Sequence, residues 1–598
     1  MPIVRTPKNG GRAANGSGRS QFVNPVRRAR LIYGLLLAVC AVFVVRLFYL
    51  QVIRHDYYSK AAQEYQLKEY QIPAERGVIL AQNGSGTTPL VLNEVKYTLF
   101  ADPVYIKDAG KTAAELAKLS NGDAGKYAEL LKTKDTRYVV LAKKLDKGQA
   151  EAIGKLNILG VGTREASYRT YPQGQLAAQL LGFVNEDGDG QYGLEQFMDA
   201  RLAGRPGELR AITDARGVPL VSSPDNVVIG PEKGETVTLT IDIGMQRQAE
   251  DLLKAGLERA QSASGSVIIM DPNSGAVKAM ANYPTYDPAK VSEVSNLADL
   301  SNAAVNSPLE PGSIMKSLTA AAAIDQGVVA PDTAFYDPGY VMVGDRKITN
   351  VRSTTGTQTV ESTLVNSLNT GAVWLLKQIG RGDINERARM TWHDYMSKRY
   401  FLGQPTGIEQ AGEAEGYVPA PEDNDQGINV TYANTAFGQA LSATPLQMSA
   451  AFSSIVNGGT YYQPALVHSE RGSDGKEHVR QPVVKKDNVI SSSASSQVVT
   501  LLERVVRQNI ASATRAGYRV GGKTGTAEFT NPADGTYYKD RFNGTYMGFV
   551  GGDRPEYVIV VRVNEPKIAG FAGSAAAAPI FRDMTNMLLD NFGVTPKS

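Results

Sequence analysis

A serine and a lysine three residues apart, Ser313 and Lys316, lie in the segment LEPGSIMKSL, residues 309–318. On a helix this spacing places both side chains on one face. Lysine can take a proton from serine only if its own pKa is lowered by burial or by a nearby cation. Apolar neighbours favour burial, and Pro311 and Gly312 favour a helix start, where unpaired N–H groups favour an anion. The pair therefore predicts a serine nucleophile with a lysine base.

The spacing alone is not specific, because it also occurs in the polar segment RGSDGKEH, residues 471–478, which we interpret as a loop. Two further motifs make it specific: serine-leucine-asparagine at 367–369, and lysine-threonine-glycine followed by threonine at 523–526. The order of the three motifs matches the penicillin-binding protein signature, whose motifs meet in one cleft.

Two other hydrolytic chemistries are less well supported. A Ser-His-Asp triad is disfavoured because none of the four histidines lies in a recognisable triad motif. A metal hydrolase is disfavoured because no HExxH motif or Cys/His cluster is present. We therefore expect neither a metal nor a cofactor. The net charge of +3 gives no global basic field, so nucleic acid is not an expected partner. The histidines are His55, His393, His468 and His478.

The elements that must position these motifs lie in an α+β domain over residues 235–590. Alternating residues at 236–241 predict a strand that leads into an amphipathic helix, and GSVIIMDPNSGAVKAMAN predicts two strands around a turn. YRVGGKTGTAEFT and TYMGFVGGDRPEYVIVVRV predict three more strands before a closing helix. Strands from both ends, with helices between them, predict an antiparallel sheet flanked by helices.

The region 54–230 looks structural rather than catalytic. YSKAAQEYQLKEY, residues 58–70, predicts a helix that continues outward from a membrane, and IPAERGVILAQNGSG predicts a short strand and a turn. AAELAKLSNGDAGKYAELLKTK predicts two helices separated by Asn-Gly.

The N-terminus predicts a membrane anchor. Residues 1–30 carry seven basic residues and no acidic one, which predicts a disordered tail. Residues 31–53 are apolar over about the 20 residues that a transmembrane helix needs. The positive-inside rule places the tail in the cytoplasm and the rest outside. Arg46 is either a snorkelling side chain or a contact with a membrane partner. Cys40 is the only cysteine, so the exported part has no disulfide.

The chain closely resembles a class B, high-molecular-weight penicillin-binding protein. The resemblance runs from the membrane span to the C-terminus and rests on LEPGSIMK, PTGIE, FGQALSATPLQM, GGKTGTAE and the YGLE block. It implies one transmembrane helix at 31–53, an elongated pedestal or dimerisation-type domain at 54–230, and a serine β-lactamase-like transpeptidase domain at 235–590. It also implies a peptidoglycan D,D-transpeptidase that cross-links stem peptides ending in D-Ala-D-Ala, and that β-lactams inhibit covalently.

The resemblance implies a role for each catalytic residue. Ser313 would attack the D-Ala-D-Ala bond and form an acyl-enzyme, while Lys316 takes the serine proton. Ser367 would relay this proton to the leaving D-alanine. Asn369 would bind the peptide amide of the substrate, and Lys523 would supply a positive charge.

The same resemblance implies the substrate-binding residues. The hydroxyls of Thr524 and Thr526 would bind the terminal carboxylate, and Gly525 would let the substrate and a neighbouring helix approach the strand. The N–H groups of Ser313 and Thr526 would form the oxyanion hole, which contributes a large share of acyl-transfer catalysis.

AMANYPTYDP and LEPGS are more similar to the septal, division-specific enzymes than to the elongation-specific ones. The apolar span and the basic tail predict a single-pass protein of the inner membrane with a periplasmic or extracytoplasmic catalytic domain. An elongation-specific enzyme, a D,D-carboxypeptidase and a scaffold are the alternatives. A β-lactamase would need neither the span nor the pedestal. A membrane glycan polymerase and division proteins are the expected partners, through the transmembrane helix and the pedestal stretch ERGVIL. Ala81 and Gln82 replace the Asp and Arg usual in the pedestal motif, and Leu368 replaces the usual Ser or Asp of the second motif.

Overall fold

The computed structural model describes residues 25–58, 67–133, 135–212, 227–422, 427–530 and 537–598. Contacts divide the chain into two units. The first comprises residues 1–72 and 207–230, and the second comprises residues 73–206 and 231–598.

The first unit contains the apolar helix α1 (Pro25–Phe48), which continues as a π-helical turn η1 (Tyr49–Ile53). Residues Ala29–Ile53 are long and apolar enough to cross a membrane. The helix predicted at 31–53 is therefore present, but it starts earlier, at Pro25, because proline suits a first helical position. The predicted disordered tail is wrong for residues 25–30, and residues 1–24 lie outside the described part.

One strand of the first unit contradicts a sequence prediction. Residues Leu67–Ile72 form strand β1, not the end of the helix predicted at 58–70. The strand pairs antiparallel with β8 (Gly207–Ile212), which also pairs with β9 (Val227–Ile229). The segment LKEYQI fits either period, so pairing with a strand far along the chain decides its structure. Residues 59–66 lie outside the described part.

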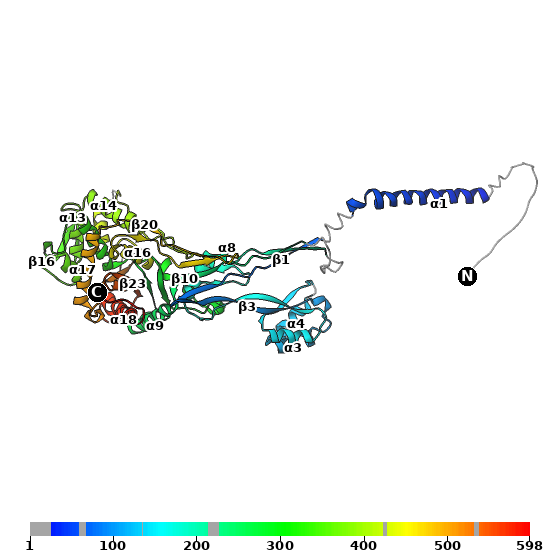
Figure 1. The fold of residues 1–598 in the computed structure, drawn as a ribbon, viewed down its shortest axis with the longest axis horizontal. Helices are drawn as coiled ribbons and strands as arrows, with labels where there is room; N and C mark the ends of the chain where they lie inside the picture. Colours follow the sequence, from blue (N-terminus) through cyan, green and yellow to red (C-terminus); the bar gives the residue numbers. More distant parts are fainter. Residues whose placement is uncertain (1–24, 59–66, 134, 213–226, 423–426, 531–536) are drawn as a thin grey trace, which may run out of the picture. The chain divides into compact units, whose positions relative to one another are not determined.

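The second unit contains the predicted antiparallel sheet (Figure 1). Its order is β12-β11-β23-β22-β21, so β21 is an edge strand. The sheet combines the two ends of the predicted catalytic region, which confirms the α+β fold. Its strands are β11 (Ser264–Met270), β12 (Val277–Tyr283), β21 (Arg519–Thr530), β22 (Tyr537–Gly551) and β23 (Pro555–Asn564).

Helices cover both faces of this sheet because the strands are apolar on both sides. Helices α9 (Ile243–Ala260) and α18 (Ala578–Asn591) share one hydrophobic cluster with Ile559 and Val561 of β23. Helices α11 (Met315–Asp325), α13 (Asn369–Ile379), α16 (Pro445–Val456) and α17 (Ser492–Asn509) share another with Val558 and Val560. The sheet therefore supports α11, which carries Lys316.

A seven-stranded sheet joins strands from both sides of the predicted boundary at 230–235. Its order is β19-β18-β10-β2-β3-β4, and β5 also pairs with β3. Strand β2 lies parallel to β10, and both contribute to one core. The domain bounds themselves stay a prediction. The strands are β2 (Ile79–Asn83), β3 (Gly86–Ala101), β4 (Val139–Leu145), β5 (Val161–Thr170), β10 (Thr236–Asp242), β18 (Val467–Arg471) and β19 (Glu477–Val479).

Three helices pack on β3 and β4: α3 (Ala109–Ser120), α4 (Ala124–Lys132) and α5 (Lys147–Lys155). Each starts with an aspartate that accepts a backbone N–H, and α3 ends where Asn121 takes a left-handed conformation. The two helices predicted around Asn-Gly are thereby confirmed.

The remaining elements are short. Around the pedestal and the sheets they are η2 (Pro103–Tyr105), α6 (Ala178–Leu181), β6 (Phe183–Val184), β7 (Gly190–Gln191), α7 (Gly193–Phe197), α8 (Asp199–Leu202), η3 (Pro288–Glu293), η4 (Leu297–Leu300) and α10 (Ala303–Asn306). Around the catalytic helix and beyond they are η5 (Gly312–Ile314), β13 (Ala334–Asp337), β14 (Tyr340–Val343), β15 (Arg346–Thr349), β16 (Gly356–Thr359), α12 (Val360–Val365), α14 (Glu386–His393), η6 (Asp394–Arg399), α15 (Ile428–Thr435), β17 (Tyr461–Tyr462), β20 (Val484–Lys486), η7 (Ala511–Ala513) and η8 (Ala572–Ala577).

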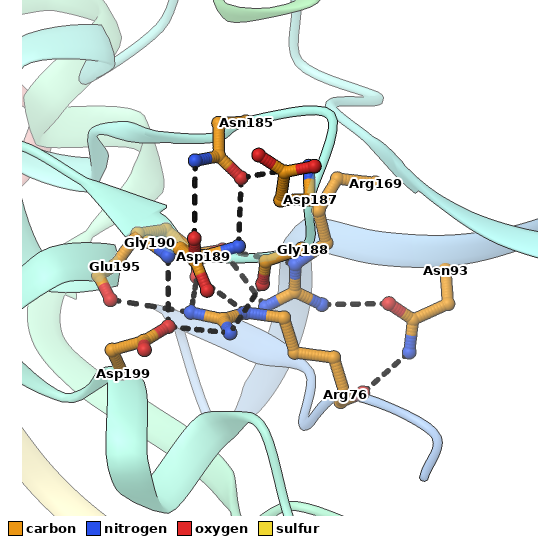
Figure 2. A network of polar contacts seen from close by, with 10 residues as sticks. All are labelled: Arg76, Asn93, Arg169, Asn185, Asp187, Gly188, Asp189, Gly190, Glu195 and Asp199. Carbon is orange, nitrogen blue, oxygen red and sulfur yellow. Dashed lines mark hydrogen bonds and ion pairs between the residues drawn. The ribbon is translucent and has the colours of Figure 1, made fainter. Parts of the chain in front are cut away.

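A buried ionic network holds the YGLE block to the strands of the pedestal (Figure 2). The Arg76 guanidinium donates to Glu195 Oε2 at 2.6 Å and pairs with Asp199 at 2.7 Å. Arg169 Nε donates to the other Glu195 oxygen at 2.9 Å. Arg76 also meets Asn93, which donates to its carbonyl oxygen at 2.5 Å. Arg76, in the ERGVIL stretch, is thus turned into the protein interior.

Ala81 and Gln82, which replace the usual Asp and Arg of the pedestal motif, lie in β2 and, being uncharged, make no ion pair. Ala81 is fully buried in the core of the seven-stranded sheet. Gln82 Nε2 donates to the Leu239 carbonyl oxygen of β10 at 3.4 Å. Both side chains therefore serve contacts within the sheet.

Candidate active site

The first motif lies at the start of α11. Ser313 belongs to the 3₁₀ turn η5 (Gly312–Ile314), and Lys316 is the second residue of the α-helix that follows. The predicted helix start is confirmed, with a tighter turn at the serine. Ser313 is half-buried, whereas Lys316 is 0% exposed. The Ser313 hydroxyl makes no hydrogen bond within the described residues.

Glycines let three segments meet beside Ser313. Gly312 has φ +64°, and a Cβ there would lie 2.5 Å from the Thr526 carbonyl oxygen of β21. Gly438 has φ +94°, and its Cβ would lie 2.0 Å from the Gly312 oxygen. Since only glycine permits both the conformation and the contact, these residues seat the serine turn against β21.

The third motif lies on β21 next to the same turn. A Cβ at Gly525 would lie 2.2 Å from Thr545 Oγ1 and 2.9 Å from the Pro311 carbonyl oxygen. The Thr545 hydroxyl donates to that oxygen at 3.0 Å. Gly525 therefore permits the close approach of strand and helix that the sequence predicted for it.

Lys316 reaches the second motif. Its Nζ donates to the Ser367 carbonyl oxygen at 2.6 Å, and Ser367 Oγ lies 3.2 Å away. Nζ also donates to Asn369 Oδ1 at 2.7 Å. Ser367 itself has φ +55°, a strained conformation for serine that functional sites often contain.

Lys523 completes the cluster from β21. It is 1% exposed, and its Nζ lies 3.0 Å from both Ser367 Oγ and the Thr524 carbonyl oxygen. The Thr524 hydroxyl lies 3.4 Å from the same Nζ, while Thr526 Oγ1 accepts the Gly573 N–H at 3.2 Å. The structure thus brings the three predicted motifs together.

The two lysines meet the condition that a lysine base requires. Burial, and the nearby charge of Lys523, lower the pKa of Lys316 well below its ordinary value. Burial lowers the pKa of Lys523 to about 7. Both shifts favour the neutral amine, because a cation loses hydration when it is buried.

One carboxylate near the serine was not predicted. Glu310 Oε1 accepts the Ala440 N–H at 2.9 Å and the Tyr537 hydroxyl at 2.8 Å. Burial raises the pKa of Glu310. The only sequence signal for Glu310 is its position three residues before Ser313. This position does not predict that Ala440 and Tyr537 are its partners.

Comparisons with known proteins agree with this geometry. A family model described as the penicillin-binding protein transpeptidase domain matches residues 265–586. A second model, the penicillin-binding protein dimerisation domain, matches residues 71–239.

Similar proteins extend over nearly the whole chain. Stage V sporulation protein D of Bacillus subtilis is 32% identical over 583 residues, which are 96% of this chain and 87% of that protein. Peptidoglycan D,D-transpeptidase FtsI of Escherichia coli is 27% identical over 579 residues, 95% of this chain and 92% of that protein.

The fold is also similar to a solved structure, penicillin-binding protein 3 of Mycobacterium tuberculosis complexed with aztreonam. Its TM-score is 0.66 at 26% identity, with 88% of this chain and 98% of that chain covered. The chain therefore belongs to the class B penicillin-binding proteins, and it is a peptidoglycan D,D-transpeptidase that acts through a serine acyl-enzyme.

Proposed function

We propose that Ser313 is the nucleophile and Lys316 its general base. The main support for this proposal is that Lys316 is fully buried where the three motifs meet, and that its pKa is lowered there. Ser313 Oγ attacks the penultimate D-alanine carbonyl of a stem peptide, and its proton passes to Lys316. The peptide bond breaks as an ester forms, and the terminal D-alanine leaves as an amine. A second amine then attacks the ester, which restores Ser313 and forms the cross-link.

Ser367 is suited to carry the proton to the leaving D-alanine. Its hydroxyl lies 3.2 Å from Lys316 Nζ and 3.0 Å from Lys523 Nζ, so it connects the base to the substrate side of β21. Asn369 is assigned to the substrate amide. Its Oδ1 accepts from Lys316 and its Nδ2 donates to the Thr349 carbonyl oxygen at 3.1 Å, so one Nδ2 hydrogen remains for the substrate.

The terminal carboxylate is assigned to Lys523 and to the hydroxyls of Thr524 and Thr526. Close packing of the serine turn on β21 at Gly312 supports an oxyanion hole formed by the N–H groups of Ser313 and Thr526. Donors fixed in this way stabilise the developing charge without reorganisation.

Penicillin labelling tests this assignment. β-Lactams present a strained amide to the same nucleophile, so the full-length protein in detergent is expected to bind a fluorescent penicillin covalently. Ser313→Ala should abolish the label. Thr319→Ser, a conservative change on the same helix, should retain it. Labelling of Ser313→Ala as strong as that of wild type would overturn the assignment. Slow loss of the label supports a transpeptidase, and rapid turnover supports a β-lactamase.

The cellular role proposed is septal cell-wall synthesis. AMANYPTYDP and LEPGS support it, as does the likeness to the transpeptidase FtsI. In a rod-shaped host, depletion should give filaments. Round cells would instead indicate a lateral-wall enzyme.

The topology proposed is a single inner-membrane span with a cytoplasmic N-terminus. The apolar helix at Ala29–Ile53 and the basic residues before it support this orientation. Residues 54–230 are assigned to a pedestal and residues 235–590 to the transpeptidase domain. A glycan polymerase and division proteins are assigned as partners of the helix and pedestal. Arg46 is either a snorkelling side chain or a contact with such a membrane partner. Cleavage of the C-terminal domain by protease added outside spheroplasts tests the orientation.

A further inference from the structure

Helix α13 (Asn369–Ile379) begins with the asparagine of the second motif, yet it has no side-chain cap of its own. The residue in the cap position is Leu368, whose side chain cannot accept a hydrogen bond. The first N–H groups of a helix have no partner within the helix and need one from elsewhere. The position of Asn369 therefore depends on whatever satisfies this end of the helix.

The missing cap comes from Asn350, which follows strand β15 of the hairpin β14–β15. Asn350 Oδ1 accepts the Thr370 N–H at 3.0 Å. The preceding residue acts on the catalytic side chain itself, because the Thr349 carbonyl oxygen accepts from Asn369 Nδ2 at 3.1 Å. This second contact fixes which way the Asn369 amide points, so that its Oδ1 faces Lys316 Nζ at 2.7 Å.

A buried carboxylate holds this arrangement in place. Asp337, at the end of β13, is 1% exposed. Its Oδ2 accepts the Thr370 hydroxyl at 2.5 Å and Asn350 Nδ2 at 3.1 Å, and its Oδ1 accepts the Gly339 N–H at 2.7 Å. A negative charge is favourable near a helix N-terminus, and hydrogen bonds to a carboxylate are the stronger kind.

We propose that Asn350 and Asp337 are positioning residues for the transpeptidase reaction, which set Asn369 and through it the base Lys316. This inference rests on the function proposed above for Asn369 and Lys316. The strand pair β13–β16 and the hairpin β14–β15 thereby support the active site from outside the three motifs. Since a displacement of about 1 Å in a catalytic group can cost about 10²-fold in rate, this support affects the rate of acylation.

The test compares acylation rates per folded molecule, with full-length protein in detergent and a fluorescent penicillin. Asn350→Ala is expected to slow acylation about ten-fold or more, because the amide of Asn369 and the end of α13 lose their anchor. The final label should still reach one per chain. Arg346→Ala, an exposed change in the same hairpin, should leave the rate unchanged.

A matched pair at Thr370 guards against simple misfolding. Thr370→Val has nearly the same volume but removes the hydroxyl, whereas Thr370→Ser retains it. Slow acylation in the valine variant with wild-type acylation in the serine variant, both with the unfolding midpoint above the assay temperature, supports a positioning role. Wild-type rates in Asn350→Ala and Thr370→Val overturn it. If Ser313→Ala still labels, the proposed function fails instead, so the two failures are distinguishable.

Discussion

The hydroxyl oxygen of Ser367 lies 3.0 Å from Nζ of Lys523, although 156 residues separate them in the sequence. Lys316 Nζ lies 3.2 Å from the same hydroxyl. A hydroxyl can accept from one cation and donate its own proton to a substrate. This geometry is what the proposed proton relay through Ser367, from the proposed base Lys316 to the leaving D-alanine, requires.

Removing this hydroxyl should therefore impair proton transfer more than binding. Ser367→Ala is expected to lower the acylation rate by about 10²-fold or more, the usual contribution of general acid–base catalysis. Lys316 keeps its two other contacts, the Ser367 carbonyl oxygen and Asn369 Oδ1. The measurement is the second-order rate of penicillin labelling. Ser367→Gly suits φ +55° better than alanine, so equal rates in the two variants would exclude backbone strain as the cause. An unchanged rate in Ser367→Ala would contradict the relay.

The pH dependence of acylation should show both lysines. Acylation needs neutral Lys316, so the rate rises with pH through a pKa that burial and Lys523 lower. It also needs charged Lys523, so the rate should fall again as pH rises through about 7. We expect a maximum near neutral pH when labelling rates are measured over a pH series with a carboxylate-bearing β-lactam. A rate that keeps rising to about pH 10, as for an ordinary lysine, would contradict this prediction.

The sequence predicts the residues of the three motifs better than it predicts the contacts that hold these residues in place. Motif order predicted that Ser313, Lys316, Asn369 and Lys523 meet in one site, and their three motifs do meet. The apolar neighbours of Lys316 predicted its burial, which is confirmed. Alternating and apolar runs predicted all five strands of the catalytic sheet, because burial on both faces leaves a local signal.

Contacts between remote polar residues leave no such signal. Asp337 ends strand β13 and Asn350 follows strand β15, in a region where the sequence predicted helices, and their partner Thr370 lies on another element. The helix predicted over the start of β1 is wrong because the strand depends on pairing with β8, which lies more than a hundred residues further along the chain. These features depend on tertiary pairing, which overrides local preference.

Gly525→Ala should separate the third motif from the serine turn. The added Cβ would lie 2.2 Å from Thr545 Oγ1 and 2.9 Å from the Pro311 carbonyl oxygen, so strand and helix must move apart. We expect loss of penicillin labelling and a free energy of unfolding lower by about 1–3 kcal/mol. The matched control is Gly154→Ala in α5, where no atom lies within 4 Å of the new Cβ. This control should gain stability, up to about 1 kcal/mol. Full labelling of Gly525→Ala would show that the strand contact is dispensable.

Glu195 should be a stability residue of the pedestal. Its side chain is fully buried between Arg76 and Arg169 (Figure 2). Glu195→Gln leaves the buried Arg169 guanidinium without its carboxylate partner and leaves Arg76 paired with Asp199 alone, which costs about 3–5 kcal/mol. Thermal unfolding of the full chain in detergent measures the loss. Glu186→Gln, at the exposed pair with Lys143, should have no measurable effect. Equal melting temperatures of Glu195→Gln and wild type would contradict the prediction.

Lys523→Met should raise the free energy of unfolding and lower the rate of penicillin labelling. Burial lowers the Lys523 pKa from 10.5 in the unfolded chain to about 7, so between these values the unfolded state binds more protons than the folded state. Stability of the wild type therefore rises with pH across this window, and part of it is lost as pH falls toward 7. Methionine fills a similar space without charge. We expect a gain of about 1–4 kcal/mol at pH 7 and a flatter dependence of unfolding midpoint on pH.

The same variant should lose most of its labelling by penicillin, because it lacks the cation proposed to bind the β-lactam carboxylate. Burial and the charge of Lys523 lower the pKa of Lys316, and the variant also lacks the second of these causes. Lys476→Met, in an exposed loop, is the control for a lost lysine charge. It should change neither labelling nor the pH dependence of stability. If Lys523→Met were less stable than wild type at pH 7, the hydrogen bonds of Lys523 to Ser367 and Thr524 would outweigh the cost of burying its charge.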